Sequence, residues 1–205
     1  MKSLKMRLES HFVAAAAVAA VAALGGAQKA DATVVSSGPV NIPIPVTTSG
    51  VYLNLVTGVN DSNPGNVSGW DVNPWSSSNL SMFNPSSPSG GVYVGSAGYA
   101  NLAPGTLIDG SSSFTSGTND VTMPLNLNSD NNFIGIRLLN EGTGQVNYGF
   151  LQIHLGASQT DPARAIIAYA YEDSGAGITT SAVPTPGSLA LLGLGGLGLT
   201  RRRRR

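Results

Sequence analysis

Short alternations of apolar and polar residues recur along the middle of the chain, whereas the i, i+3, i+4 spacing of an amphipathic helix is absent. Such alternation is typical of strands, and turn formers such as Asn63-Pro64-Gly65 and Asp161-Pro162 separate the alternating stretches. We therefore predict strands over residues 40–46, 51–56, 91–95, 106–108, 133–139, 147–155 and 165–171. Many short strands without helices predict an all-β fold, a single antiparallel β-sandwich of jelly-roll-like topology over residues 33–182.

The strongest hairpin signal lies between Phe133 and Leu155, where two apolar stretches flank a loop that contains two glycines. Alternate residues of a strand share a face, so His154 should face solvent, opposite the apolar positions of its strand. By the same rule, Arg137 points away from the core face of the first strand. An unpaired charge inside an apolar strand is costly, so we expect Arg137 to pair with a carboxylate.

The N-terminal end has the three parts of a secretory signal peptide. Lys2, Lys5 and Arg7 precede an apolar run that ends near Leu24, and Ala30-Asp31-Ala32 forms a small-residue cleavage site. We predict a signal helix within residues 1–32, handled by the secretion translocon, and cleavage by signal peptidase after Ala32. A cut after Ala27 is the alternative. A membrane anchor is the other interpretation, although the run is shorter than the roughly 20 apolar residues that a spanning helix needs.

The C-terminal end, residues 183–205, also has three parts. A proline-rich motif comes first, then an apolar stretch of about 13 residues, which is near 20 Å as a helix and short for a hydrocarbon core of about 30 Å. A basic cluster follows and favours the cytoplasmic side of the membrane. The motif consists of Val183, Pro184, Thr185, Pro186 and Gly187, and the basic cluster consists of Arg201, Arg202, Arg203, Arg204 and Arg205.

This tripartite end resembles the PEP-CTERM sorting signal of exported bacterial proteins. The resemblance implies a short transmembrane helix and an exosortase-like enzyme that cuts at the motif and passes the protein to the cell surface or extracellular matrix. Thr185 departs from the family pattern, which has glutamate there, and gives a Val-Pro-Thr-Pro variant. An ordinary tail anchor with a basic cytoplasmic end is the alternative.

The central region is also similar to segments of uncharacterised exported proteins that carry the same sorting tail. The resemblance lies in stretches such as Gly69-Trp70-Asp71-Val72-Asn73-Pro74 and Ala168-Tyr169-Ala170-Tyr171-Glu172-Asp173. Asn147 and Phe150 depart from those relatives, which often have histidine and tryptophan there. The resemblance implies the fold and the destination, and it brings no known activity.

Charge and composition narrow the function further. The whole chain has 11 basic and 11 acidic side chains, but residues 33–182 hold only Arg137 and Arg164 against nine acidic residues, a net charge of about −7. A lysine-free, anionic domain repels phosphate, which excludes a nucleic-acid partner. The absence of cysteine excludes disulfides, thiolate metal sites and cysteine nucleophiles.

Glycan binding is the most specific chemistry that the sequence indicates. The densest cluster of aromatic and hydrogen-bonding side chains is formed by Trp70-Asp71 and Asn73-Pro74-Trp75. Phe83, Tyr93 and Tyr99 lie in the same half of the domain. Exposed rings beside such groups suit sugar rings, so exopolysaccharide is the predicted partner. The alternative is that Trp70 is a core residue covered by Trp75.

Two other chemistries have weaker signals. Asp61 and Asn63, and Asn128 and Asp130, alternate oxygen donors over short loops and are calcium candidates, although neither pair completes a calcium-loop motif and such residues also form turns. A secreted glycoside hydrolase with paired carboxylates is the alternative function, but the sequence does not single out a pair. We expect no catalytic residues and, apart from calcium, no cofactor. The favoured prediction is a non-enzymatic exported protein that is transiently anchored in the inner membrane and then reaches the surface or matrix.

Overall fold

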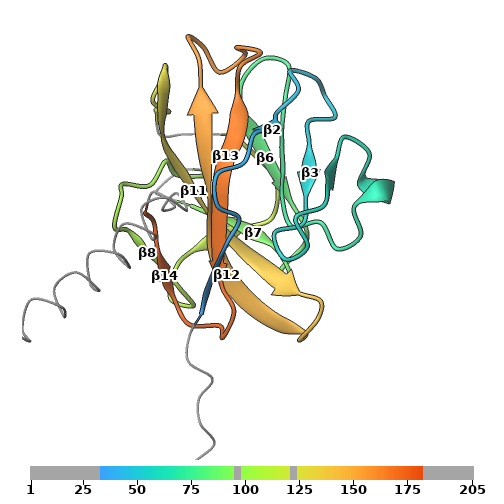
Figure 1. Ribbon diagram of the computed structural model, residues 1–205, viewed down its shortest axis with the longest axis vertical. Helices are drawn as coiled ribbons and strands as arrows, with labels where there is room; N and C mark the ends of the chain where they lie inside the picture. Colours follow the sequence, from blue (N-terminus) through green and yellow to red (C-terminus); the bar gives the residue numbers. More distant parts are fainter. Residues whose placement is uncertain (1–32, 95–97, 121–123, 182–205) are drawn as a thin grey trace, which may run out of the picture. The chain divides into compact units, whose positions relative to one another are not determined.

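The computed structural model describes residues 33–94, 98–120 and 124–181 (Figure 1). These residues belong to the compact unit Ala32–Arg205. Their regular structure is all-β apart from one short 3₁₀ helix, η1, at Pro64–Asn66, and every strand pairing is antiparallel. Among these residues no helix has the length and apolarity needed to cross a membrane. The predicted signal helix, sorting motif and arginine cluster lie outside the described residues.

The largest sheet has seven strands, and its longest members are central. The order is β1 (Val34–Ser36), β13 (Ala165–Glu172), β12 (Gln145–Leu155), β11 (Ser129–Asn140), β7 (Gly91–Tyr93) and β9 (Phe114–Thr115), with β2 (Ile42–Pro43) also paired to β13. The three-stranded sheet has the order β10 (Gly117–Asp120), β6 (Ser81–Asn84) and β5 (Asn73–Trp75). Two short pairs complete the fold: β3 (Tyr52–Leu53) with β4 (Asn60–Asp61), and β8 (Leu107–Ile108) with β14 (Ile178–Thr179).

The predicted hairpin is confirmed as β11 and β12, which are longer than the sequence pattern suggested. Ile134 pairs with Leu151, and the loop between the strands is Glu141 to Gly144. His154 is half-exposed, as expected for a residue on the polar positions of β12, and its Nδ1 lies 2.6 Å from Oδ1 of Asp130.

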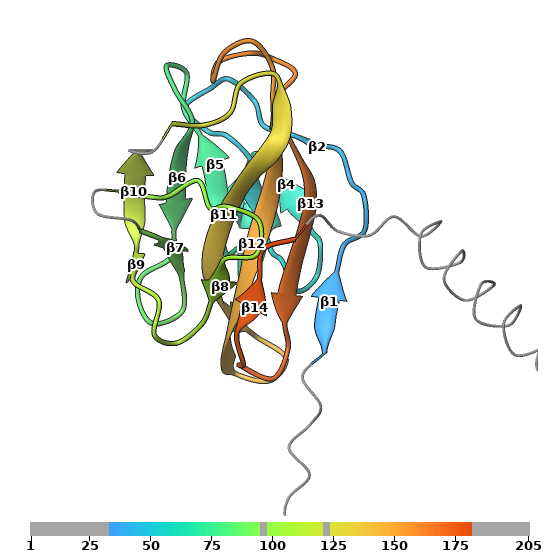
Figure 2. The ribbon, with the colours of Figure 1, turned by 90° about the vertical axis from the view of Figure 1, so that its left-hand side faces the viewer.

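Both faces of the large sheet are covered. On one face the aliphatic residues of β11 and β12 pack against residues from β3, β6 and the chain before β5, including Leu53, Val72 and Met82. On the other face Phe133 and Phe150 pack against Ile108 of β8 and Ile178 of β14. Figure 2 shows β8 and β14 in front of β11 and β12. Much of the large sheet is therefore covered on both sides. Aliphatic residues cover one face, and a cluster that contains Phe133 and Phe150 covers the other.

Arg164, which directly precedes β13, has no exposed surface and is held entirely by backbone carbonyls. Its Nε donates to Ile44 O at 3.0 Å, Nη1 to Asn79 O at 2.7 Å and Gln159 O at 2.8 Å, and Nη2 to Pro45 O at 2.6 Å and Ser76 O at 2.7 Å. A guanidinium has five N–H donors, so its donor capacity is fully used. Arg164 thus joins three loops at one end of the domain.

Arg137 differs from its prediction. Its Nη2 donates to Gly90 O at 2.8 Å, and its guanidinium carbon lies 5.1 Å from the centre of the Phe114 ring. Within the described part of the chain the one ion pair is that of His154 with Asp130, so Arg137 has no carboxylate partner there. The residue is only half-buried, and a carbonyl and a ring face stabilise its charge in place of a carboxylate.

Replacing Arg164 by methionine should lower the free energy of unfolding by at least about 3 kcal/mol, because several buried carbonyls lose their donors together. The matched variant Arg137→Met should cost about 1 kcal/mol, since it removes one hydrogen bond and one ring contact. Urea denaturation followed by tryptophan fluorescence measures both. Equal losses for the two variants would contradict the role assigned to Arg164.

Candidate functional site

Four aromatic side chains lie together at the outward face of the three-stranded sheet. Phe83 of β6 pairs with Asn73 of β5, so the two share a face, and Trp75 follows on the same face two residues later. Met82, the neighbour of Phe83, points to the opposite side and is fully buried. Tyr52 and Trp70 are half-buried beside them, which makes an aromatic face of Tyr52, Trp70, Trp75 and Phe83.

Three rings of this aromatic face, those of Tyr52, Trp70 and Phe83, are in contact through Trp70. The centroids of Trp70 and Phe83 are 5.2 Å apart with an angle of 33° between the planes, and those of Tyr52 and Trp70 are 4.9 Å apart in an edge-to-face arrangement of 78°. The indole N–H of Trp75 is buried and has no hydrogen-bond partner among the described residues. The ring contacts position Tyr52, Trp70 and Phe83, and all four side chains remain partly accessible.

A pocket of about 170 Å³ opens on the aromatic face. No charged side chain is among the described residues that line it, which are Thr48, Tyr52, Asn73, Trp75, Phe83 and Thr118. Gly50 allows the turn after Thr48 to approach Trp75, because it has a φ of +62° and a Cβ there would lie 2.3 Å from Pro74 O. Asn73 Nδ2 donates to Ser49 O at 2.8 Å and fixes the same turn.

Asp71 does not belong to this face, which corrects the grouping of Trp70, Asp71 and Trp75. Its side chain is only 2% exposed, and its Oδ2 accepts a hydrogen bond from the Leu55 amide at 2.7 Å. Its neighbour Trp70 is half-buried and packs beside Phe83, whereas Asp71 is enclosed. Burial, together with the smaller effect of the Glu141 charge, raises the pKa of Asp71 to about 8, against the opposing effect of the Leu55 amide.

The other predicted aromatic residues lie elsewhere. Tyr99 is fully buried, and its hydroxyl donates to Leu80 O at 2.5 Å, so it is a core residue. Tyr93 makes an edge-to-face contact with Phe114, which stacks on Tyr148 with centroids 5.9 Å apart. This second aromatic cluster packs against the core on the other face of the large sheet.

The calcium candidates are divided between two loops. The Asp61 carboxylate accepts from the Asn63 amide at 2.8 Å and from Asn66 Nδ2 at 3.1 Å, and these bonds lower its pKa. Asn63 Oδ1 accepts from the Gly65 amide at 3.0 Å. Near the start of β11, Asn128 has a φ of +47° and Asp130 contacts His154. The first set uses its side-chain oxygens to form a turn, whereas the Asp130 carboxylate is engaged by His154. The described chain contains no group of three or more His, Cys, Asp or Glu side chains that could hold a metal ion.

The carboxylates that come close together do not face the aromatic pocket. Asp71 and Glu141 influence each other electrostatically, but Asp71 is enclosed, and Glu141 Oε1 lies 3.4 Å from Asn54 Nδ2. Glu172 is 1% exposed, and its Oε1 accepts from the Ser174 amide at 2.9 Å. A glycoside hydrolase needs two carboxyl groups on either side of the scissile bond in an accessible cleft, so this geometry gives the hydrolase alternative no specific support.

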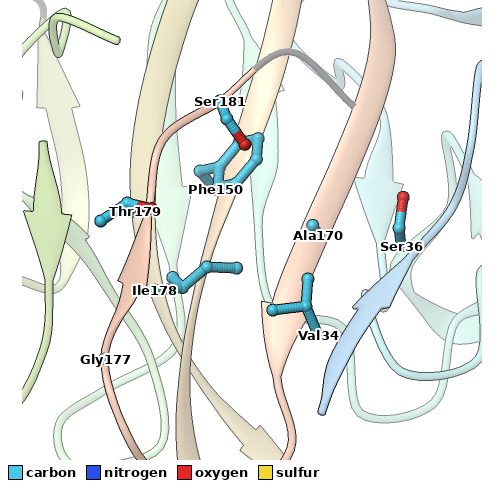
Figure 3. A pocket seen from close by; sticks show the side chains of 8 residues that line it. All are labelled: Val34, Ser36, Phe150, Ala170, Gly177, Ile178, Thr179 and Ser181. Atoms are coloured by element: carbon cyan, nitrogen blue, oxygen red, sulfur yellow. The ribbon is translucent and has the colours of Figure 1, made fainter. Parts of the chain in front are cut away.

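A second hollow, of about 240 Å³, lies between β1 and β14 (Figure 3). Phe150 and Ala170 line it from the large sheet, and Val34 and Ile178 from its two sides. Only small hydroxyl groups interrupt this largely aliphatic lining, so it offers less for recognition than the aromatic pocket does.

Comparison of the chain with protein-family models, with curated proteins and with solved structures finds no match. The chemistry of the site therefore follows from its own residues. The sequence pattern predicts Trp70, Asn73 and Trp75, with Phe83 as a nearby aromatic residue. It does not predict Tyr52 and Thr118, which also line the pocket. Thr118 pairs with Phe83, and Leu53, the neighbour of Tyr52, bridges to Val72.

Replacing Asp71 by asparagine should stabilise the domain at neutral pH. The native carboxyl titrates near pH 8 and the unfolded one near 3.9, so the contribution of Asp71 to the free energy of unfolding is greatest below about pH 4, falls as the pH rises to about 8 and is then constant. Asparagine keeps an oxygen for the Leu55 amide and does not ionise. Urea midpoints measured from pH 4 to 8 should therefore diverge in favour of the variant.

The variant Glu141→Gln is the control for this titration. It removes a charge that raises the pKa of Asp71 and leaves the carboxyl in place, so the decline of stability with pH should become shallower. Parallel curves for wild type and Asp71→Asn would show that Asp71 has an ordinary pKa.

Proposed function

We propose that this chain is an exported, non-enzymatic protein of the bacterial surface or extracellular matrix that binds glycan through its aromatic face. The observation that carries the proposal is the pocket in which Tyr52, Trp75 and Phe83 meet Asn73 and two threonines. The C–H faces of sugar rings pack on aromatic rings, and sugar hydroxyls bond to amide and hydroxyl groups.

The charge of the site favours an uncharged glycan. The described lining of the pocket has no charged side chain, and the domain around it has a net charge of about −7. A polysaccharide rich in uronic acids would meet long-range repulsion from this domain and no cation in the pocket. A neutral exopolysaccharide avoids both penalties.

In this proposal the scaffold is a jelly-roll-like β-sandwich. The three-stranded sheet packs its inner residues, such as Met82, against β11 and β12 and leaves Trp75 and Phe83 outward. Ligand groups held on paired strands are more rigid than groups on long loops. The packing of the inner face therefore supports a preformed binding surface.

The destination is proposed from the two ends of the chain. Residues 1–32 act as a signal peptide for the translocon and signal peptidase, and residues 183–205 act as a sorting signal for an exosortase-like enzyme. The first strand of the described domain, β1, begins at Val34, which supports a domain that starts next to the predicted cut. After transient anchoring in the inner membrane, the trimmed protein reaches the surface or matrix.

The intact mass of the protein recovered from cells and from culture medium tests this processing. We expect a mass that lacks the residues before Thr33 and lacks the tail after the Pro184 region. A mass that retains Arg201 to Arg205 in every fraction would instead describe a tail-anchored protein and would remove the sorting proposal.

Retention on polysaccharide extracted from the producing organism tests glycan binding. Trp75→Ala should weaken retention at least about tenfold, because a ring in the centre of a binding face contributes more than about 1.4 kcal/mol. Tyr52→Ala should act in the same direction from the other side of the pocket.

The matched control is Phe114→Ala, which removes a half-exposed ring from the second aromatic cluster, outside the aromatic face. Its retention should equal that of the wild type. Unchanged retention of folded Trp75→Ala and Tyr52→Ala would refute the glycan site, and neutral and uronate-rich competitors would separate the two classes of glycan.

A further inference from the structure

The edge strand β1 is connected to the end of β13 through the first residue that the structure describes. The backbone N–H of Thr33 donates to Oδ1 of Asp173 at 3.0 Å, and the Asp173 amide donates to Thr33 O at 3.1 Å. In the next step of the register, Val34 pairs with Glu172. The nitrogen of Thr33 therefore already lies against a carboxylate.

The same nitrogen is the one that cleavage after Ala32 would release. We infer that signal peptidase hydrolyses the Ala32–Thr33 bond and that the new α-ammonium of Thr33 forms an ion pair with Asp173, which fastens β1 to the sheet. This inference rests on the export part of the proposed function. In the hydrolysis, water adds a hydroxyl to the Ala32 carbonyl carbon and a proton to the Thr33 nitrogen, which takes up a second proton at neutral pH.

Cleavage strengthens the contact between the Thr33 nitrogen and the Asp173 carboxylate and leaves the two partners the same. An amide that donates to a carboxylate becomes a cation that donates to it, and charge-assisted hydrogen bonds are the stronger kind. The position of the cut is decisive: cleavage after Ala27 would leave five residues between the new charge and Thr33. Only the cut after Ala32 places the ammonium group beside Asp173.

The positive charge of the Thr33 α-ammonium can be removed selectively, because the cleaved chain contains no lysine. All three lysines of the chain, Lys2, Lys5 and Lys29, precede the cut, so the α-amine of Thr33 is the single primary amine of the cleaved chain. Acetylation with an amine-selective reagent therefore modifies this nitrogen alone. The product again has an amide N–H at Thr33, as in the uncut chain, and differs from the cleaved form by one charge.

The test uses residues 33–205, produced with Thr33 as the first residue, which lie within a compact unit of their own. Four samples combine a free or acetylated amine with Asp173 or with Asp173→Asn. Hydrogen exchange of the β1 amides is the readout. Acetylation should speed exchange about two- to fivefold when Asp173 is present, the range of an exposed ion pair, and should have little effect in Asp173→Asn.

Salt gives a second readout, because exposed ion pairs are screened at high ionic strength. At 1 M NaCl the difference between free and acetylated chains should largely disappear. If acetylation changes exchange equally with and without the Asp173 carboxylate, the ion pair is overturned.

N-terminal sequencing of the exported protein tests the cut separately. A chain that begins at Thr33 supports the assigned bond, and a chain that begins at Gln28 overturns it while leaving export intact. A protein that keeps residues 1–32 would refute the export proposal itself, whatever the exchange experiment shows for the cleaved chain.

Discussion

Five peptide carbonyls converge on the guanidinium of Arg164, and the arrangement of one whole end of the domain depends on this interaction. One carbonyl belongs to Ser76, the neighbour of Trp75, whose φ of +103° is unusual for a residue with a side chain. The Ser76 amide also donates to Thr47 O at 3.0 Å. The buried cation thus stabilises a strained backbone directly beside the aromatic pocket. The geometry of the pocket therefore depends on the buried hydrogen bonds of Arg164.

The sequence pattern predicted the long central strands well, because β11, β12 and β13 alternate apolar residues over many positions. The outer strands were harder. The segments around Ser81, Gly117 and Asn60 are rich in Asn, Ser and Gly, and they are strands because other short strands pair with them. The partner of Gly117 is the distant Asn84, whereas Asn60 pairs with the nearby Leu53. Such pairing leaves no local periodic signal.

The two arginines show a different limit. Arg137 interrupts an apolar strand, and this pattern predicts a carboxylate partner. Arg164 is the arginine that is fully buried, yet its partners are carbonyls, which every residue possesses, so no side-chain pattern could reveal them. At the site, the density of aromatic residues identified Trp70 and Trp75. The sequence could not show that Asp71 points inward, because the segment around it is too short to have a periodic pattern.

The short pairing of β14 has a mechanical consequence. A protein held at its C-terminal side transmits any pull through Ser181 into β14, which is joined to β8 by only two residue pairs, Ile178 with Ile108 and Thr179 with Leu107. The ten residue pairs between β11 and β12 resist far more. Under tension the pairing of β14 with β8 would open first, while the aromatic face, which lies on the other side of the large sheet, would keep its shape.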